Sequence, residues 1–143
     1  MTRSWFVLLL VPLVYVLAAV RWSEGLRGQF AVVRAWTPER FVSAVQRAGG
    51  PAAVRTGLGL EVVFIVLVAA VATPLLWYAG GVWVLPLAAA GLDAWEAVVL
   101  APMLGTRPKK KRTRLLAVIA WGKILAYLLS VIALAAACLA ASP

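Results

Sequence analysis

Histidine is absent from this 143-residue sequence, and cysteine occurs only once, at Cys138. Without histidine the chain cannot build a serine–histidine–aspartate triad or a histidine metal site. A single cysteine excludes an intrachain disulfide, a thiol redox pair and a cysteine zinc cluster within one chain. We therefore expect neither a metal nor a redox cofactor.

Charged residues are scarce as well. They make up 13% of the chain, while 64% of it is hydrophobic and the mean hydropathy is +0.97. Soluble domains carry roughly 25% charged residues, so this excess of apolar side chains must face something other than water. The formal net charge of +9 would suggest nucleic acid in a soluble protein. In a membrane protein such charge marks cytoplasmic loops, and we predict no nucleic-acid partner.

Long apolar runs are abundant. A membrane span needs roughly 20 mostly apolar residues, and four segments qualify: about 4–20, 58–78, 82–104 and 115–141. The second and third are joined by a very short connection, which predicts a tight antiparallel hairpin. The sequence thus predicts an all-α polytopic membrane protein, with residues 1–143 forming one integral membrane domain built as an antiparallel four-helix bundle.

The first span could instead be a cleaved signal peptide. Only Arg3 precedes its apolar run, whereas six arginines follow in the next loop, the reverse of the secretory charge pattern. We therefore expect the span to be retained. Basic residues gather in the first and third loops, which places both loops in the cytoplasm and both termini outside, in a bacterial inner membrane. The third loop, 107–114, could also bind anionic lipid head groups or an acidic partner.

The first loop is too long for a simple connection. Thr37, Pro38 and Glu39 suit the N-cap and first turn of a helix. Apolar residues within 38–48 then fall on one stripe. The pattern predicts a short amphipathic helix at the cytoplasmic interface.

Four charged residues lie inside the predicted spans: Glu61, Asp93, Glu96 and Lys123. Such charges are costly and commonly functional. Asp93 and Glu96 are three residues apart and share a helix face. Counted inward from the loop between them, Glu96 and Lys123 lie at the same depth, so we expect them to meet. Three acids then face one lysine, and we expect one carboxyl group to be protonated near neutral pH.

Each of these charges also has a structural interpretation. Glu96 and Lys123 can simply neutralise each other and set the register of two helices. Glu61 can be an interfacial residue paired with Arg55, the nearest basic residue in sequence. Asp93 is the hardest to explain in this way, because it lies deep and lacks an obvious cationic partner.

Aromatic residues lie near the same depth. Trp95 and Trp121, together with Tyr15 or Tyr127, can wall a site for an apolar ligand. Alternatively, they only pack in an apolar core. We regard these four side chains as candidate substrate contacts.

The Thr-Pro-Glu helix start in the first loop and the segment Leu92-Asp93-Ala94-Trp95-Glu96 in the third span resemble a loose group of small four-span bacterial membrane proteins. That group typically has asparagine after the glutamate, whereas Ala97 follows here. The resemblance covers roughly residues 37–104. It supports the architecture and the choice of Asp93 and Glu96, and it implies no function.

Three functions fit these observations. The first is a cofactor-independent membrane enzyme, such as an isomerase, a cyclase or an epoxide-opening enzyme, that acts on a lipophilic isoprenoid, polyene or lipid through Asp93, Glu96, Lys123 and Glu61. The second is a non-catalytic accessory or assembly subunit with a membrane partner protein. The third is a proton-coupled transporter, which would need a homo-oligomer. Membrane lipids are partners in all three.

Overall fold

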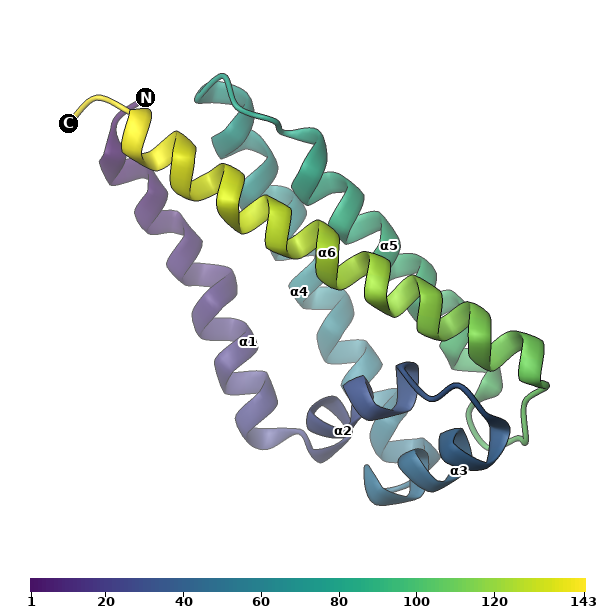
Figure 1. The fold of residues 1–143 in the computed structure, drawn as a ribbon. Helices are drawn as coiled ribbons and strands as arrows, with labels where there is room; N and C mark the ends of the chain where they lie inside the picture. The colour runs from purple at the N-terminus through teal and green to yellow at the C-terminus, as the bar shows by residue number, and fades with distance from the viewer.

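The computed structural model describes residues 1–143 and contains helices and no strands (Figure 1). The elements in chain order are η1 (Arg3–Leu9), α1 (Leu10–Trp22), α2 (Glu24–Val33), α3 (Pro38–Arg47), α4 (Pro51–Tyr78), α5 (Val84–Leu100), η2 (Ala101–Met103) and α6 (Lys110–Ala140). Four helical stretches are long and apolar enough to cross a membrane: Arg3–Trp22, Pro51–Tyr78, Val84–Met103 and Lys110–Ala140.

These four helices lie side by side, and the two chain ends meet at one end of the molecule (Figure 1). The backbone N–H of Arg3 donates to the carbonyl of Ser142 at 3.0 Å, and its guanidinium donates to the carbonyl of Leu139 at 2.9 Å. α4 and α6 both begin several residues before the predicted spans. Hydropathy detects only the apolar part of a helix, while the backbone hydrogen bonds continue into its polar first turns.

The long first loop holds two helices, not the single one that the sequence predicts. α3 matches the predicted helix, because Pro38 opens it and the Thr37 hydroxyl accepts a hydrogen bond from the backbone N–H of Arg40 at 3.3 Å. α2 is an addition. Ser23 caps it by accepting from the backbone N–H of Leu26 at 3.1 Å, and Glu24 in the first turn complements the positive helix terminus.

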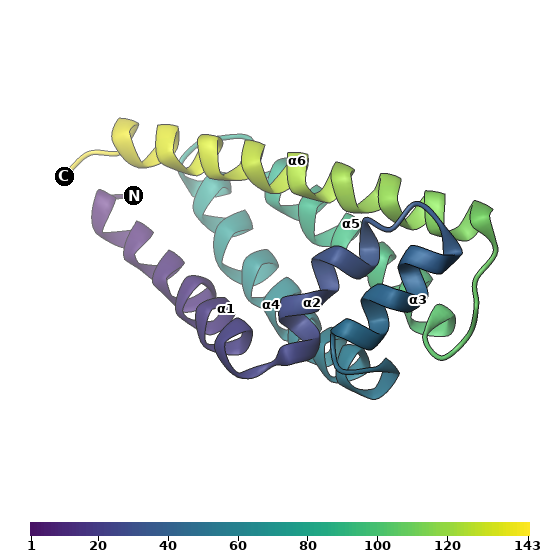
Figure 2. The same ribbon diagram turned by 60° about the horizontal axis from the view of Figure 1, so that its bottom comes forward.

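The main hydrophobic core lies at the end of the molecule where α2 and α3 pack across α4, α5 and α6 (Figure 2). Its fully buried side chains include Val32, Phe41, Val54, Leu100 and Leu116. Away from this end, the outward faces of the long helices carry exposed apolar side chains such as Val66 and Leu139. An apolar outer surface of this extent is expected for helices surrounded by lipid.

Two glycines let α2 approach α4 closely. A Cβ atom on Gly57 would lie 2.7 Å from the backbone nitrogen of Leu26, and a Cβ on Gly25 would overlap the carbonyl of Ala53. Only hydrogen fits at these two positions, so the two backbones pack in direct contact. The contact holds α2 against the face of α4 that carries Glu61.

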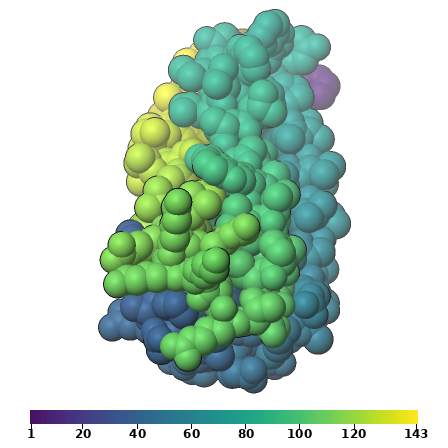
Figure 3. Space-filling model, turned by 90° about the vertical axis from the view of Figure 1, so that its right-hand side faces the viewer, coloured from purple at the N-terminus to yellow at the C-terminus, as the bar shows by residue number.

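The first turn of α6 and the segment before it are anchored on the α2–α3 region. Figure 3 shows this green segment lying over the blue α3 region at one end of the molecule. Arg107 forms an ion pair with Glu39, and the Thr113 hydroxyl donates to the carbonyl of Trp36 at 3.1 Å. A hydrogen bond from its own backbone N–H, together with Arg107, lowers the pKa of the exposed Glu39 carboxyl. These contacts fix where α6 begins and thus the height of Lys123.

Candidate acid–base site

The ammonium group of Lys123 lies at the centre of three carboxylates. Its Nζ is 3.2 Å from Oε1 of Glu61, 3.1 Å from Oδ1 of Asp93 and 2.8 Å from Oε1 of Glu96. All three carboxylates are buried, and Glu96 is 0% exposed. One cation therefore connects α4, α5 and α6 through buried ion pairs.

Helix geometry explains why these groups meet. Asp93 and Glu96 stand one turn apart on the face of α5 that is turned toward α6. The expected contact between Glu96 and Lys123 is present. Glu61 completes the group from α4, which packs against both α5 and α6.

Two uncharged side chains extend the cluster. The Tyr127 hydroxyl, one turn after Lys123 on α6, donates to Oδ2 of Asp93 at 2.7 Å. Gln29 on α2 donates from its amide nitrogen to Oε2 of Glu61. Both oxygens of Asp93 and both oxygens of Glu61 are thereby hydrogen-bonded.

Glu96 is different. Its Oε2 atom is buried and has no hydrogen-bond partner, and the same holds for Oε1 of Gln29. Buried polar atoms are nearly always paired, so two unpaired acceptors in one cluster call for a donor. A proton, a water molecule or the hydroxyl or ammonium group of a ligand can supply it.

A small cavity opens beside these atoms. It has a volume of about 140 Å³ and is lined by Gln29, Glu61, Glu96 and Lys123 together with apolar side chains of α2. Sites for drug-sized ligands usually measure about 300–1,000 Å³. This cavity accommodates a few waters or one small polar group, and not a whole isoprenoid or polyene.

The three carboxylates could also be considered as metal ligands. One ligand oxygen from each of Glu61, Asp93 and Glu96 lies within 4.8 Å of the others. However, the Lys123 ammonium lies within hydrogen-bond distance of all three, where it would repel a metal cation. The donor set as arranged fits an ammonium group.

The aromatic candidates are placed differently from what the sequence suggests, apart from Tyr127. Trp95 and Trp121 are each 50% exposed, and neither lines the cavity beside the cluster. Each lies two residues from a cluster member, which turns it by about 200° around its helix. Trp95 and Trp121 therefore do not line the cavity beside the charged cluster, and their contact with an apolar ligand stays a prediction.

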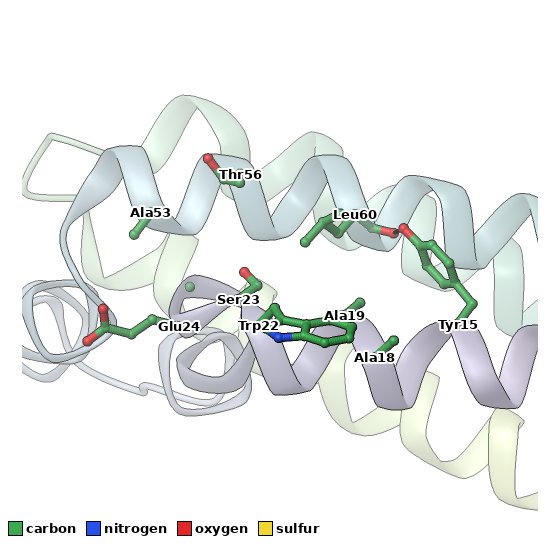
Figure 4. A pocket seen from close by; sticks show the side chains of 10 residues that line it. Tyr15, Ala18, Ala19, Trp22, Ser23, Glu24, Ala53, Thr56 and Leu60 are labelled. Atoms are coloured by element: carbon green, nitrogen blue, oxygen red, sulfur yellow. Dashed lines mark hydrogen bonds between the residues drawn. The ribbon is translucent and has the colours of Figure 1, made fainter.

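Tyr15 lies in a separate groove between α1 and α4 (Figure 4). Its hydroxyl donates to the carbonyl of Leu60 at 2.8 Å, which ties α1 to α4. The groove has a volume of about 450 Å³ and is lined largely by small and apolar residues. Tyr15 makes no hydrogen bond with the carboxylates, and its contact with an apolar ligand stays a prediction.

The hydrogen-bond partners of Glu61 differ from the predicted alternative in which it pairs with Arg55. Its partners are Lys123 and Gln29, whereas Arg55 donates to the carbonyl of Leu104 at 3.3 Å. Proximity in sequence was a poor guide, because Arg55 and Glu61 are six residues apart and do not share a helix face. Gln29 was not predicted as a site residue, because the helix that carries it, α2, was not predicted either.

The chain was compared with protein-family models, curated proteins and solved structures, and none of them gave a match. The geometry of the site therefore carries the functional argument.

Proposed function

We propose that this chain is a small integral membrane enzyme whose carboxylate–lysine cluster moves protons to and from the polar end of a lipophilic molecule. The observation that carries the proposal is the buried, unpaired Oε2 atom of Glu96 beside a cavity of about 140 Å³. This oxygen is the one carboxylate atom of the cluster that neither Lys123 nor a neutral side chain occupies.

The charge balance supports acid–base chemistry. If Glu61, Asp93 and Glu96 were all ionised, the single ammonium of Lys123 would leave two uncompensated negative charges in a buried site. Excess buried charge is costly, and binding of protons removes that cost. A carboxylic acid that holds its proton near neutral pH is the form that general acid catalysis requires.

In the proposed reaction Glu96 gives its proton to a double bond or an epoxide oxygen of the substrate and becomes a carboxylate. In an isomerisation or cyclisation the substrate cation then loses a proton from a neighbouring carbon to a carboxylate of the cluster. In epoxide opening a water molecule forms the new C–O bond and gives one of its protons to that carboxylate, so the protein recovers its proton in each case. Lys123, which contacts Glu96 at 2.8 Å, stabilises the carboxylate that this proton transfer leaves. The apolar remainder of the substrate stays in the surrounding lipid, because the cavity is too small to enclose it.

We further propose how the chain sits in its membrane. The four long helices cross a bacterial inner membrane as an antiparallel bundle, with both termini outside. α2, α3 and the basic segment before α6 then lie on the cytoplasmic side, where arginine and lysine are enriched. In this arrangement the cavity beside Glu96 opens nearer to the cytoplasmic surface.

The test uses deuterium as a tracer. Membranes containing the protein are incubated in D2O with a bacterial lipid extract, and the lipids are analysed by mass spectrometry for deuterium in C–H positions or for addition of water. We expect a labelled or hydrated lipid with the native protein and its loss in Glu96→Gln. The matched control is Glu24→Gln, because Glu24 is exposed and forms no ion pair. Labelling that persists in Glu96→Gln contradicts the proposal, as does a complete lack of labelled or hydrated lipid.

A non-catalytic accessory role is the second candidate. It is favoured by the way Lys123 directs its donors to three carboxylates, which is a complete use of an ammonium group. The exchange Glu96→Lys with Lys123→Glu separates the two functions. Restored stability with intact cellular function supports the structural role, and restored stability with lost function supports chemistry.

A further inference from the structure

Three arginines surround a second hollow near the acidic cluster. Arg34 ends α2, and Arg40 and Arg47 lie two turns apart on α3. All three line a hollow of about 410 Å³ that is closed on its α6 side by Trp121. Helices α2 and α3 both contact α6 there (Figure 2).

No acidic side chain neutralises these arginines. The protein has five acidic residues. Glu61, Asp93 and Glu96 bind Lys123, while Glu39 pairs with Arg107. Glu24 lines the groove beside Tyr15, on another part of the surface. Three positive charges thus converge on one hollow without a counter-charge from the chain, which favours an anionic ligand.

The walls hold one of these arginines in place. The guanidinium carbon of Arg34 lies 4.8 Å from the centre of the Phe30 ring, and Phe30 in turn meets Trp121 edge to face at 6.0 Å. Arginine is suited to bidentate hydrogen bonding of phosphate oxygens, and a guanidinium that rests on a ring loses less freedom on binding. Trp36 and three alanines complete the lining.

An apolar strip leads away from the hollow along α6. It consists of Trp121, Leu125, Leu128 and Ile132, which are all half-exposed or more and recur at helical spacing. Trp121 lies six residues beyond Leu115, about 9 Å into the apolar part of α6.

We propose that this hollow binds the phosphate head group of an anionic lipid through Arg34, Arg40 and Arg47, with one lipid chain lying along the exposed strip of α6. The continuity of the arginine hollow with an apolar helix face selects a lipid over a free phosphate. The site goes beyond the proposed acid–base chemistry and does not depend on it, because it shares no residue with the carboxylate cluster.

The experiment measures lipid binding to the purified full-length chain in a neutral detergent at physiological salt, by native mass spectrometry. The probes are phosphatidylglycerol, phosphatidylcholine with the same chains, and inorganic phosphate. We expect the native protein to prefer phosphatidylglycerol, and Arg34→Gln/Arg40→Gln/Arg47→Gln to bind it at least about tenfold more weakly, as charge-assisted hydrogen bonds are lost. The comparison variant is Lys109→Gln/Lys110→Gln/Lys111→Gln, which removes the same charge at the start of α6, in the other basic segment that could attract anionic lipid. If the hollow holds the head group, this variant should change affinity less than about twofold.

Several outcomes overturn the proposal. Equal losses in the two triple variants would mean diffuse attraction to a basic surface, and an unchanged affinity in the arginine variant would mean that lipid binds elsewhere. Inorganic phosphate binding as tightly as phosphatidylglycerol would exclude a lipid as the specific occupant. If the arginine triple variant does not fold, the exposed single substitutions Arg40→Gln and Arg47→Gln provide the same comparison. Lipid with brominated chains should quench native tryptophan fluorescence, and quenching that is unaffected by Trp121→Phe would exclude the proposed chain path.

Discussion

The hydroxyl of Tyr127 donates to Oδ2 of Asp93 at 2.7 Å, while Lys123, one turn earlier on the same helix, binds Oδ1 of that carboxylate at 3.1 Å. Two donors on one face of α6 therefore give each oxygen of Asp93 one hydrogen bond. In Glu96, one turn away on α5, Oε1 accepts one bond and Oε2 accepts none. This difference leads us to assign Asp93 a positioning role and Glu96 the exchange of protons.

The first prediction concerns Tyr127→Phe. Removal of the hydroxyl leaves a buried carboxylate oxygen unpaired, so we expect the free energy of unfolding in detergent to fall by about 1–3 kcal/mol. The control is Tyr78→Phe, because Tyr78 is 75% exposed and its hydroxyl makes no hydrogen bond within the protein. Equal stability of the two variants would show that the bond to Asp93 contributes nothing.

The second prediction concerns Lys123→Met. Three buried carboxylates then lack their cation, and loss of one partner from a buried ion pair typically costs about 3–5 kcal/mol. The loss should be smaller at acidic pH, where protonation removes the carboxylate charges. Thermal unfolding at acidic and neutral pH measures both effects, with Lys111→Met on the exposed start of α6 as control. A loss that does not depend on pH contradicts the proposed charge imbalance.

The third prediction tests the close approach of α2 and α4. In Gly57→Ala the new methyl group would meet the backbone nitrogen of Leu26 at 2.7 Å, and we expect the free energy of unfolding to fall by about 1–3 kcal/mol. Gly59→Ala in the same helix meets no atom within 4 Å and should be neutral or slightly stabilising, because alanine favours helix more than glycine does. If the two substitutions have the same effect, the packing of α2 against α4 is looser than described.

The fourth prediction tests the orientation in the membrane. In a Cys138→Ala background, a membrane-impermeant maleimide should label Val82→Cys in intact bacteria and Thr106→Cys only after the cells are permeabilised. Both positions are exposed at opposite ends of α5, so they report the two sides of the membrane. The reverse labelling pattern would invert the proposed topology.

Sequence reasoning located the four long helices and the contact between Glu96 and Lys123, because both follow from counting along helices that are joined by short loops. The expectation that three acids face one lysine agrees with the contact between Glu61 and Lys123, which are 62 residues apart. The alternative pair of Glu61 with Arg55 is not formed, because Arg55 donates to the carbonyl of Leu104.

Other differences could have been foreseen. Ser23 and Glu24 carry the residue types of a helix start, which would have revealed α2 and with it Gln29. Asp93 and Trp95 are two residues apart in one helix, which directs their side chains away from each other. The exact helix ends could not be predicted, because hydropathy does not report where backbone hydrogen bonding stops.

α1 is held differently from the other long helices. Of its 13 residues only Pro12 and Ala19 are buried, whereas eight residues of α4 are. Its side-chain attachment is the bond from Tyr15 to α4, and η1, which precedes it, is tied to the end of α6 by Arg3. α1 contributes little to the common core, so its amide hydrogens should exchange with solvent or lipid-phase water ahead of those in α4, α5 and α6. The other three helices share the ion pairs of Lys123 without α1, so we expect α1 to detach first when the protein is destabilised.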